Sequence, residues 1–236
     1  MGTSVSQAAE RQPGRVLLSW SGGKDSALAL YELRAADREV AALVTTITGE
    51  YERVSMHGVR RALLVRQAAA VGIPLEEVVI PPKASNEQYE SALGGVLLRW
   101  KERGVDTTAF GDLFLEDVRR YREAFLAGRG LRGLYPIWKH DTAATARRFV
   151  ALGFRAIVVC VDPRALEPRF AGRWIDERFL DELPPSVDPC GENGEFHTFV
   201  ADGPGFRMPV AVRAGETVTR DGFAYVDLLP EEARDP

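Results

Sequence analysis

The sequence predicts an α/β fold in which a doubly wound parallel sheet is followed by a second, smaller α+β domain. Apolar segments of strand length alternate with segments of helical spacing over the first half. A glycine-rich turn joins the first strand to the first helix, the pattern changes from about Trp138, and short β segments dominate after Cys190. Strands that alternate with helices are typical of a parallel sheet with helices on both faces. We therefore expect a disordered tail at 1–14, a first domain over 15–134 and a second over 135–236.

Length and composition restrict the class of protein. A chain of 236 residues can form one large domain or two small ones. A net charge of −4 gives no general attraction to nucleic acid or to anionic membranes. No segment approaches the roughly 18 consecutive apolar residues of a membrane span. The two cysteines, Cys160 and Cys190, are too few to form a metal cluster alone and indicate a reducing cytoplasm.

The expected elements of the first domain are bounded by turn residues. The strands are Val16–Trp20, Glu39–Thr48, Glu76–Ile80, Thr107–Phe110 and Leu131–Pro136. A first helix begins by Ala27, a polar loop covers Gly49–Met56, and further helices are expected at His57–Val71, Asn86–Arg103 and Leu115–Leu126. Asn86 is the expected cap of its helix. This order places each helix between two strands, as a parallel sheet requires.

The turn Ser21-Gly22-Gly23-Lys24-Asp25-Ser26 follows the first strand directly. Two glycines allow the backbone to approach a ligand closely. The first N–H groups and the positive end of the helix dipole then favour an anion such as phosphate. Lys24 adds a mobile positive charge and Asp25 a carboxylate for magnesium. A simple turn with a helix cap is the alternative, but the whole segment favours nucleotide binding through Ser19, Ser21, Gly22, Gly23, Lys24, Asp25 and Ser26.

Two further groups follow neighbouring strands and are expected at the same edge of the sheet, where α/β proteins bind ligands. Gly111-Asp112 follows Thr107–Phe110, and Asp112 is expected to hold magnesium or to orient the nucleotide. His57 follows the second strand across a polar loop, so it is either a ligand contact or a helix-cap residue. The charged residues of the next helix are equally open, either as a solvated face or as part of the site: Glu116, Asp117, Arg119, Arg120 and Arg122.

The second domain has a different texture. Helices are expected from Asp141-Thr142 to Leu152 and near Glu177–Leu183. Strands are expected at Phe154–Val161, Phe196–Val200, Met208–Val212, Glu216–Thr219 and Phe223–Leu228. The segment 188–199 stands out because glycines bracket an acidic turn that carries Glu192, Glu195 and His197. An Asn-Gly hairpin turn explains the glycine at its centre but not the flanking charged groups.

These carboxylates can bind a cationic or amide-bearing substrate, and His197 can transfer a proton near neutral pH. Cys190 is either a nucleophile or a packed thiol, and the lack of a base beside it in the sequence favours the packed thiol.

The six-residue turn resembles the pyrophosphate loop of N-type ATP pyrophosphatases, which split ATP between its α and β phosphates. Together with Gly111-Asp112, Leu115-Glu116-Asp117 and 191–198, it resembles the diphthine–ammonia ligase family from about Arg15 to Gly203. The resemblance implies an adenine nucleotide α-hydrolase-like domain, a substrate domain, and ATP with Mg²⁺. It further implies that an acceptor carboxylate is adenylated and that ammonia then displaces AMP. Catalysis would fall to Lys24, Asp25 and Asp112, with metal on Asp25 and Asp112; the acceptor would contact Glu116, Glu192, Asn193, Gly194, Glu195, His197 and Thr198.

The sequence departs from that family within this last motif. Relatives that make diphthamide carry Glu-Gly-Gly-Glu-Phe-Glu, whereas Asn193 stands here in place of a glycine and His197 in place of the final glutamate. The acceptor can therefore be a small-molecule or protein-borne carboxylate other than diphthine. Ammonia would come as free ammonium or from a separate partner, because no glutaminase domain fits in this length. We expect a bacterial-type member, cytoplasmic and not membrane-bound, without the extra C-terminal domains of eukaryotic relatives. A homodimer is compatible with the sequence.

Three other functions are compatible with the phosphate loop. A tRNA-modifying pyrophosphatase would carry a basic patch and often a Cys-x-x-Cys pair, and this acidic chain shows neither. A non-catalytic ATP sensor would have no need of the 190–198 segment. An amidohydrolase that has lost its ligase activity is the third. The sequence therefore favours a ligase and argues against nucleic acid as a partner.

Overall fold

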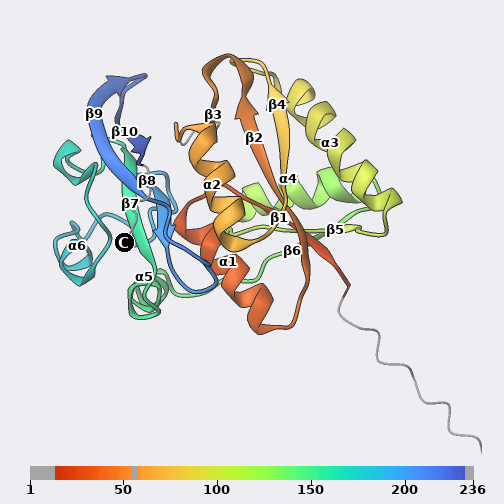
Figure 1. Cartoon of the computed structure of the whole chain (residues 1–236), viewed down its shortest axis with the longest axis horizontal. Helices are drawn as coiled ribbons and strands as arrows, with labels where there is room; N and C mark the ends of the chain where they lie inside the picture. Colours follow the sequence, from red (N-terminus) through yellow and green to blue (C-terminus); the bar gives the residue numbers. More distant parts are fainter. Residues whose placement is uncertain (1–13, 55–57, 232–236) are drawn as a thin grey trace, which may run out of the picture.

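The computed structural model describes residues 14–54 and 58–231, and the chain forms two sheets side by side (Figure 1). The first sheet has the order β3-β2-β1-β5-β6, with β4 pairing with β2. Every pairing in it is parallel except that of β3, which runs antiparallel to the end of β2. Its strands are β1 (Val16–Ser19), β2 (Val40–Thr48), β3 (Arg53–Val54), β4 (Leu75–Ile80), β5 (Thr107–Ala109) and β6 (Arg132–Leu134).

Helices cover both faces of this sheet, so the predicted doubly wound architecture is confirmed. They are α1 (Lys24–Ala35), α2 (Arg61–Val71), α3 (Asn86–Glu102) and α4 (Glu116–Ala127). Successive residues of β1 point to opposite faces. Leu18 packs in one core with apolar residues of α1 and α2, whereas Leu17 packs in the other with residues of α3 and α4.

The second sheet is antiparallel, with the order β8-β7-β10-β9. Its strands are β7 (Arg155–Val161), β8 (Phe196–Asp202), β9 (Val212–Arg220) and β10 (Phe223–Pro230). The helices of this part are α5 (Thr142–Ala151), η2 (Pro168–Phe170) and α6 (Glu177–Asp181). A small antiparallel α+β unit therefore follows the parallel sheet, as the change in sequence texture predicted.

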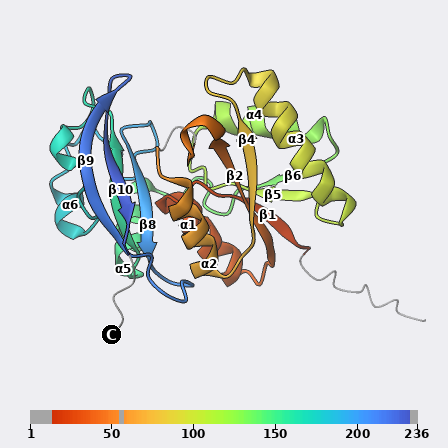
Figure 2. The same cartoon turned by 45° about the horizontal axis from the view of Figure 1, so that its top comes forward.

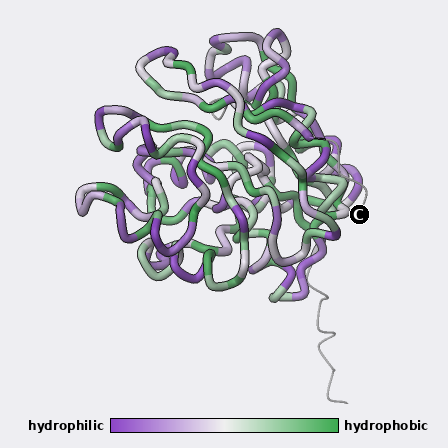
Figure 3. Tube along the Cα trace, turned by 60° about the vertical axis from the view of Figure 1, so that its left-hand side comes forward, coloured by the Kyte–Doolittle hydropathy of each residue, from purple (hydrophilic) through white to green (hydrophobic). Residues whose placement is uncertain are grey.

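The two sheets do not form separate cores. One apolar cluster runs from Leu28 of α1 and Leu63 of α2 to Phe199 of β8, and Figure 2 shows β8 alongside α1 and α2. Backbone hydrogen bonds cross the same boundary, from Val200 N to Gly22 O at 2.9 Å. Hydrophobic stretches run through the middle of the molecule in Figure 3, and hydrophilic ones lie mainly in the outer loops. The second unit is thus packed directly against the glycine-rich turn.

Two local expectations are wrong. Within the predicted polar loop, η1 (Gly49–Tyr51) and β3 form a turn and a short edge strand, because Val54 pairs with Ile47 and is buried there. Met208 and the next three residues lie outside any strand, and β9 begins only at Val212.

The cap of α3 also differs from the expectation. Ser85, and not Asn86, is the N-cap: its hydroxyl accepts from Gln88 N, while the Gln88 side chain accepts from Ser85 N. This capping box satisfies two backbone donors at once, which a cap at Asn86 would not do here.

No helix among residues 14–54 and 58–231 has the length and apolar character needed to cross a membrane. His57 lies outside the described residues, so the expectation for it stays a prediction.

Candidate functional site

The glycine-rich turn adopts a conformation that only small residues permit. Gly22 has φ +79°, and a Cβ there would lie 2.6 Å from Gln67 Oε1. Gly23 is the N-cap of α1, and a Cβ on it would lie 3.1 Å from the backbone oxygen of Thr198. Both glycines are therefore also required for packing, because the turn is held between α2 and β8.

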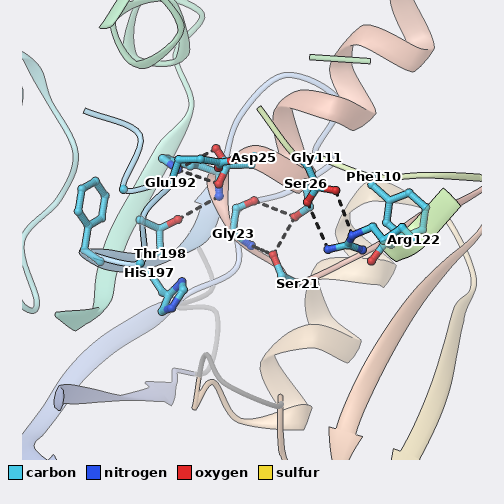
Figure 4. Close-up of a pocket in the computed structure, with 16 residues that line it drawn as sticks. Ser21, Gly23, Asp25, Ser26, Phe110, Gly111, Arg122, Glu192, His197 and Thr198 are labelled. Atoms are coloured by element: carbon cyan, nitrogen blue, oxygen red, sulfur yellow. Dashed lines mark hydrogen bonds and ion pairs between the residues drawn. The ribbon is translucent and has the colours of Figure 1, made fainter. Parts of the chain in front are cut away.

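Hydroxyl groups brace the turn from inside (Figure 4). Ser26 Oγ donates to Gly23 O at 2.9 Å, and Ser21 Oγ accepts from Gly23 N at 3.2 Å. The first backbone N–H of α1, on Lys24, donates to Thr198 Oγ1 at 3.0 Å. A residue of the second unit thus caps the helix that follows the phosphate-type turn.

Gln67 fixes the turn from the other side, and no pattern in the sequence pointed to it. Its side chain is fully buried. Its Oε1 accepts from Trp20 Nε1 at 3.1 Å, and its Nε2 donates to Gly22 O at 3.0 Å and to Val200 O at 2.5 Å. One amide thereby joins α2, the glycine turn and β8.

Lys24 and Asp25 form an ion pair at the start of α1. Lys24 Nζ donates to both carboxylate oxygens of Asp25 at 2.7 Å, and the ammonium lies 5.7 Å from the centre of the Phe196 ring. Burial acts to lower the pKa of Lys24, but the attraction of Asp25 and of neighbouring acidic groups outweighs it and the pKa is raised. The Lys24 side chain therefore remains positively charged although it is buried.

Asp112 and Arg122 form a second ion pair across the cavity wall. Arg122 Nη2 donates to Asp112 Oδ1 at 3.2 Å, and the guanidinium lies 4.3 Å from the centre of the Phe110 ring. Arg122 Nε is 3.0 Å from Asp112 Oδ2, but neither atom forms a hydrogen bond within the described residues. Burial chiefly raises the pKa of Asp112; Arg122 opposes this and the charge of Asp25 adds to it.

The two glutamates of the acidic turn are used differently. Glu195 is buried, and its carboxylate accepts from Asp188 N, Asn193 N and Asn193 Nδ2, each at 3.0 Å. It holds the turn together and, like Asn193, does not line the cavity. Glu192 does line it, and its Oε1 accepts from Leu113 N at 2.8 Å. Burial chiefly raises the pKa of Glu192, with a smaller contribution from the charge of Asp25.

Burial shifts the pKa of both His197 and Cys190 away from neutral pH. Burial, with a contribution from Lys24, lowers the pKa of His197 to about 4, so the ring is neutral. The role of His197 in proton transfer stays a prediction, and this low pKa does not favour it. Burial raises the pKa of Cys190 to about 12, and its Sγ donates to Thr142 O at 3.3 Å, as expected of a packed thiol.

These groups enclose one cavity at the carboxyl edge of the parallel sheet. Its walls come from the turn after β1, the residues after β5, one residue of α4, and the second unit. The predicted site residues that it brings together are Ser19, Ser21, Gly23, Lys24, Asp25, Ser26, Gly111, Asp112, Glu192, Gly194, His197 and Thr198. Gly22 lies behind this wall. Glu116 does not reach it: its exposed carboxylate lies 3.5 Å from Lys139 Nζ.

A second cavity opens beside the first and is more apolar. It lies at the ends of β1, β2 and β4, against Trp20, Val44 and Ile80, with Tyr89 of α3 also in its wall. Ser19, Ser21 and Arg122 border both cavities. A ligand with an apolar end and an anionic end can therefore occupy both at once.

The doubly wound sheet, the braced turn at a helix N-terminus and the adjoining apolar cavity define the class as a nucleotide-binding α/β protein. Comparison with known families is more specific. Residues 14–133 match the model of the diphthamide synthase N-terminal domain, and residues 141–228 match that of the diphthamide synthase C-terminal domain. The chain belongs to the diphthamide synthase family.

Named relatives align along almost the whole chain. Proteins named diphthine–ammonia ligase are 29% identical in Danio rerio and 26% identical in Homo sapiens. The alignments cover 91% of this chain and 93% and 90% of those proteins. We expected eukaryotic relatives to carry extra C-terminal domains, and these two relatives do not, because the alignments cover nearly their whole length. A solved structure titled as a predicted subunit of tRNA methyltransferase from Methanocaldococcus jannaschii aligns with 15% identity and a TM-score of 0.41, over 79% of this chain and 96% of that one.

Proposed function

We propose that this protein is an ATP-dependent ligase that converts a carboxylate into an amide with ammonia. The observation that carries the proposal is the shared cavity, because the turn Ser21–Ser26 and the segment 191–198 of the second unit line it together. A nucleotide phosphate and an acceptor held by these two segments would meet. The names of the relatives, diphthine–ammonia ligases, support the same reaction.

The nucleotide would lie across both cavities. The apolar cavity beside Trp20 and Tyr89 suits an adenine ring. The turn and the N-terminus of α1 suit the β and γ phosphates, because backbone N–H groups and the helix dipole favour anions there. Lys24, kept protonated by Asp25, would offset the negative charge that develops on pyrophosphate.

The resemblance also implies Mg²⁺. Among the described residues, no group of three His, Cys, Asp or Glu side chains is placed to hold a metal. Mg²⁺ commonly takes only one or two carboxylates and completes its shell with water and phosphate oxygens. Asp25 and Asp112 fit this mode because both line the cavity. Asp112 Oδ2 accepts no hydrogen bond from a described residue, although Arg122 Nε lies 3.0 Å from it and Asp25 pairs with Lys24. Mg²⁺ bound there would supply charge neutralisation for the leaving pyrophosphate.

The acceptor would enter from the second unit, beside Glu192, Gly194, His197 and Thr198. The acceptor carboxylate attacks the α-phosphate, forming a C–O–P bond while the bond to the β-phosphate breaks and pyrophosphate leaves. Ammonia then adds to the acyl carbon, AMP departs with the bridging oxygen, and the excess proton passes to solvent. We assign nucleotide binding to residues 15–134 and acceptor binding to 135–236. A neutral His197 would suit an acceptor less cationic than one held by the glutamate of diphthamide-forming relatives.

The alternatives have less support. A non-catalytic sensor does not require a second unit that caps α1 through Thr198 and contributes Glu192 to the same cavity. A tRNA-modifying pyrophosphatase would be favoured by a basic surface, and the net charge of the chain is −4. We place the activity in the cytoplasm, where reducing conditions keep thiols such as Cys160 and Cys190 free.

The reaction products test the proposal. Purified protein is incubated with ATP, Mg²⁺ and ammonium, in one arm with a diphthine-bearing protein and in the other with a pool of carboxylate metabolites. We expect AMP and pyrophosphate in at least one arm, and neither from the Lys24→Ala variant. ADP with phosphate would contradict the proposal. ATP binding without turnover in both arms would favour the sensor.

A further inference from the structure

Arg122 occupies the junction of the two cavities. Among the residues that the structure describes, only Ser19, Ser21 and Arg122 border both of them, and of the three only Arg122 carries a charge. The sequence offered no means of choosing it among the arginines of α4. Figure 4 shows the guanidinium next to Phe110 and on the same side of the cavity as Ser21 and Ser26. A positive group is therefore placed where an anion would pass from one cavity into the other.

The side chain is held in place but is not fully satisfied. It stacks on Phe110 and forms one hydrogen bond, at 3.2 Å, to Asp112. A guanidinium commonly pairs with a carboxylate through two parallel hydrogen bonds. Here Arg122 Nε is buried and lies 3.0 Å from Asp112 Oδ2, but the two atoms do not form a hydrogen bond. The single hydrogen bond leaves other N–H groups of the fork available to a ligand.

We propose that Arg122 binds the α-phosphate of ATP and that Asp112 positions it. The proposal rests on the proposed function, which places the adenine in the apolar cavity and the β and γ phosphates at the turn. The α-phosphate is the group that joins these two parts of ATP. It therefore lies at the junction that Arg122 lines.

This contact has a chemical consequence. An acceptor carboxylate and the α-phosphate are both anions, so their approach is opposed by charge repulsion. A guanidinium on the α-phosphate reduces that repulsion and stabilises the charge that develops as the O–P bond forms. Lys24 and the N-terminus of α1 act on the departing pyrophosphate, so Arg122 would be the cation assigned to the phosphorus under attack.

The test requires no acceptor. Adenosine, AMP, ADP and ATP are titrated by calorimetry into the wild type and into the Arg122→Gln and Arg122→Lys variants, without Mg²⁺. Arg119→Gln is the matched control: it lies on the same helix and pairs with Glu123, outside both cavities. Thermal unfolding of each variant shows that it is folded.

We expect Arg122→Gln to lower the affinity for AMP, ADP and ATP by the same factor, about 10- to 100-fold. A hydrogen bond to a charged group contributes about 1.5–3 kcal/mol. Adenosine should bind unchanged, Arg122→Lys should lose less, and Arg119→Gln should match the wild type. An equal loss of affinity for adenosine, or a loss of affinity confined to ADP and ATP, would overturn the assignment. If the wild type binds none of the four ligands either without or with added Mg²⁺, the proposed function fails instead.

Discussion

Replacing Gln67 by leucine tests whether the glycine turn depends on a single buried amide. The substitution keeps an apolar stem of similar size but removes three hydrogen bonds, to Trp20, Gly22 and Val200. Gly22 O retains its bond from Val200 N. Trp20 is buried, and Gln67 is the acceptor that its indole N–H would lose.

The magnitude follows from this difference between the partners. An orphaned buried donor costs about 1–3 kcal/mol, and each ordinary hydrogen bond that is lost about 1 kcal/mol. We therefore expect Gln67→Leu to lower the free energy of unfolding by about 2–4 kcal/mol, equivalent to a fall in Tm of about 10 °C for a chain of this length. Trp20→Phe should cost about 1 kcal/mol less in the Gln67→Leu variant than in the wild type, because the indole N–H that it removes is already without an acceptor there.

Urea denaturation of the four proteins of this cycle measures both quantities. Val65→Ala, on the half-exposed side of α2, is the control for changes in helix stability. ATP affinity should fall together with stability, because the turn loses its support from α2. A Gln67→Leu protein within about 0.5 kcal/mol of the wild type, as for a surface substitution, would refute the reasoning.

Two further predictions concern His197 and Gly111. The pKa of His197 is about 4 when folded against an ordinary 6.5, so the unfolded state takes up the proton first and stability falls as pH drops through this window. The free energy of unfolding should therefore fall by about 2 kcal/mol between about pH 7 and about pH 5. Urea titrations at both pH values should show a smaller loss of stability for His197→Asn than for the wild type. An equal loss in the two proteins would contradict the burial argument. A Cβ on Gly111 would lie 2.8 Å from the backbone oxygen of Asp25, so Gly111→Ala should weaken ATP binding about tenfold or more. Gly95→Ala in α3 meets no atom within 4 Å and should leave ATP affinity unchanged while raising stability by about 0.5–1 kcal/mol; equal ATP affinity in the two variants would show that the turn tolerates displacement.

The sheet and the turn could be predicted because their signals are local. Alternating apolar segments specify strands and helices, and the turn Ser21–Ser26 follows a strand within a few residues. The cap of α3 at Ser85 was missed although its signal is local too, since Gln88 lies three residues on. The edge strand β3 was missed because two residues carry too little pattern, and only pairing with the end of β2 makes them a strand.

The roles of side chains within the site could not be predicted from the sequence in the same way. Arg119 and Arg122 lie on one helix, yet Arg119 pairs with Glu123 and Arg122 with Asp112 in the cavity wall. Which of the two arginines reaches the cavity depends on where α4 lies relative to β5 and β1, and the local sequence does not specify that arrangement. Glu192 faces the cavity whereas the neighbouring Glu195 closes the turn, because the backbone direction between them is set by tertiary packing.

Transfer of ¹⁸O from the acceptor to AMP is the most direct test of the proposed chemistry. The acceptor carboxylate that supports turnover is labelled with ¹⁸O, and the nucleotide products are resolved by mass spectrometry. Adenylation followed by attack of ammonia predicts one ¹⁸O atom in AMP, with pyrophosphate unlabelled. Unlabelled AMP would mean that water attacks the α-phosphate, and label in inorganic phosphate beside ADP would mean an acyl phosphate; either result would contradict adenylation at this site.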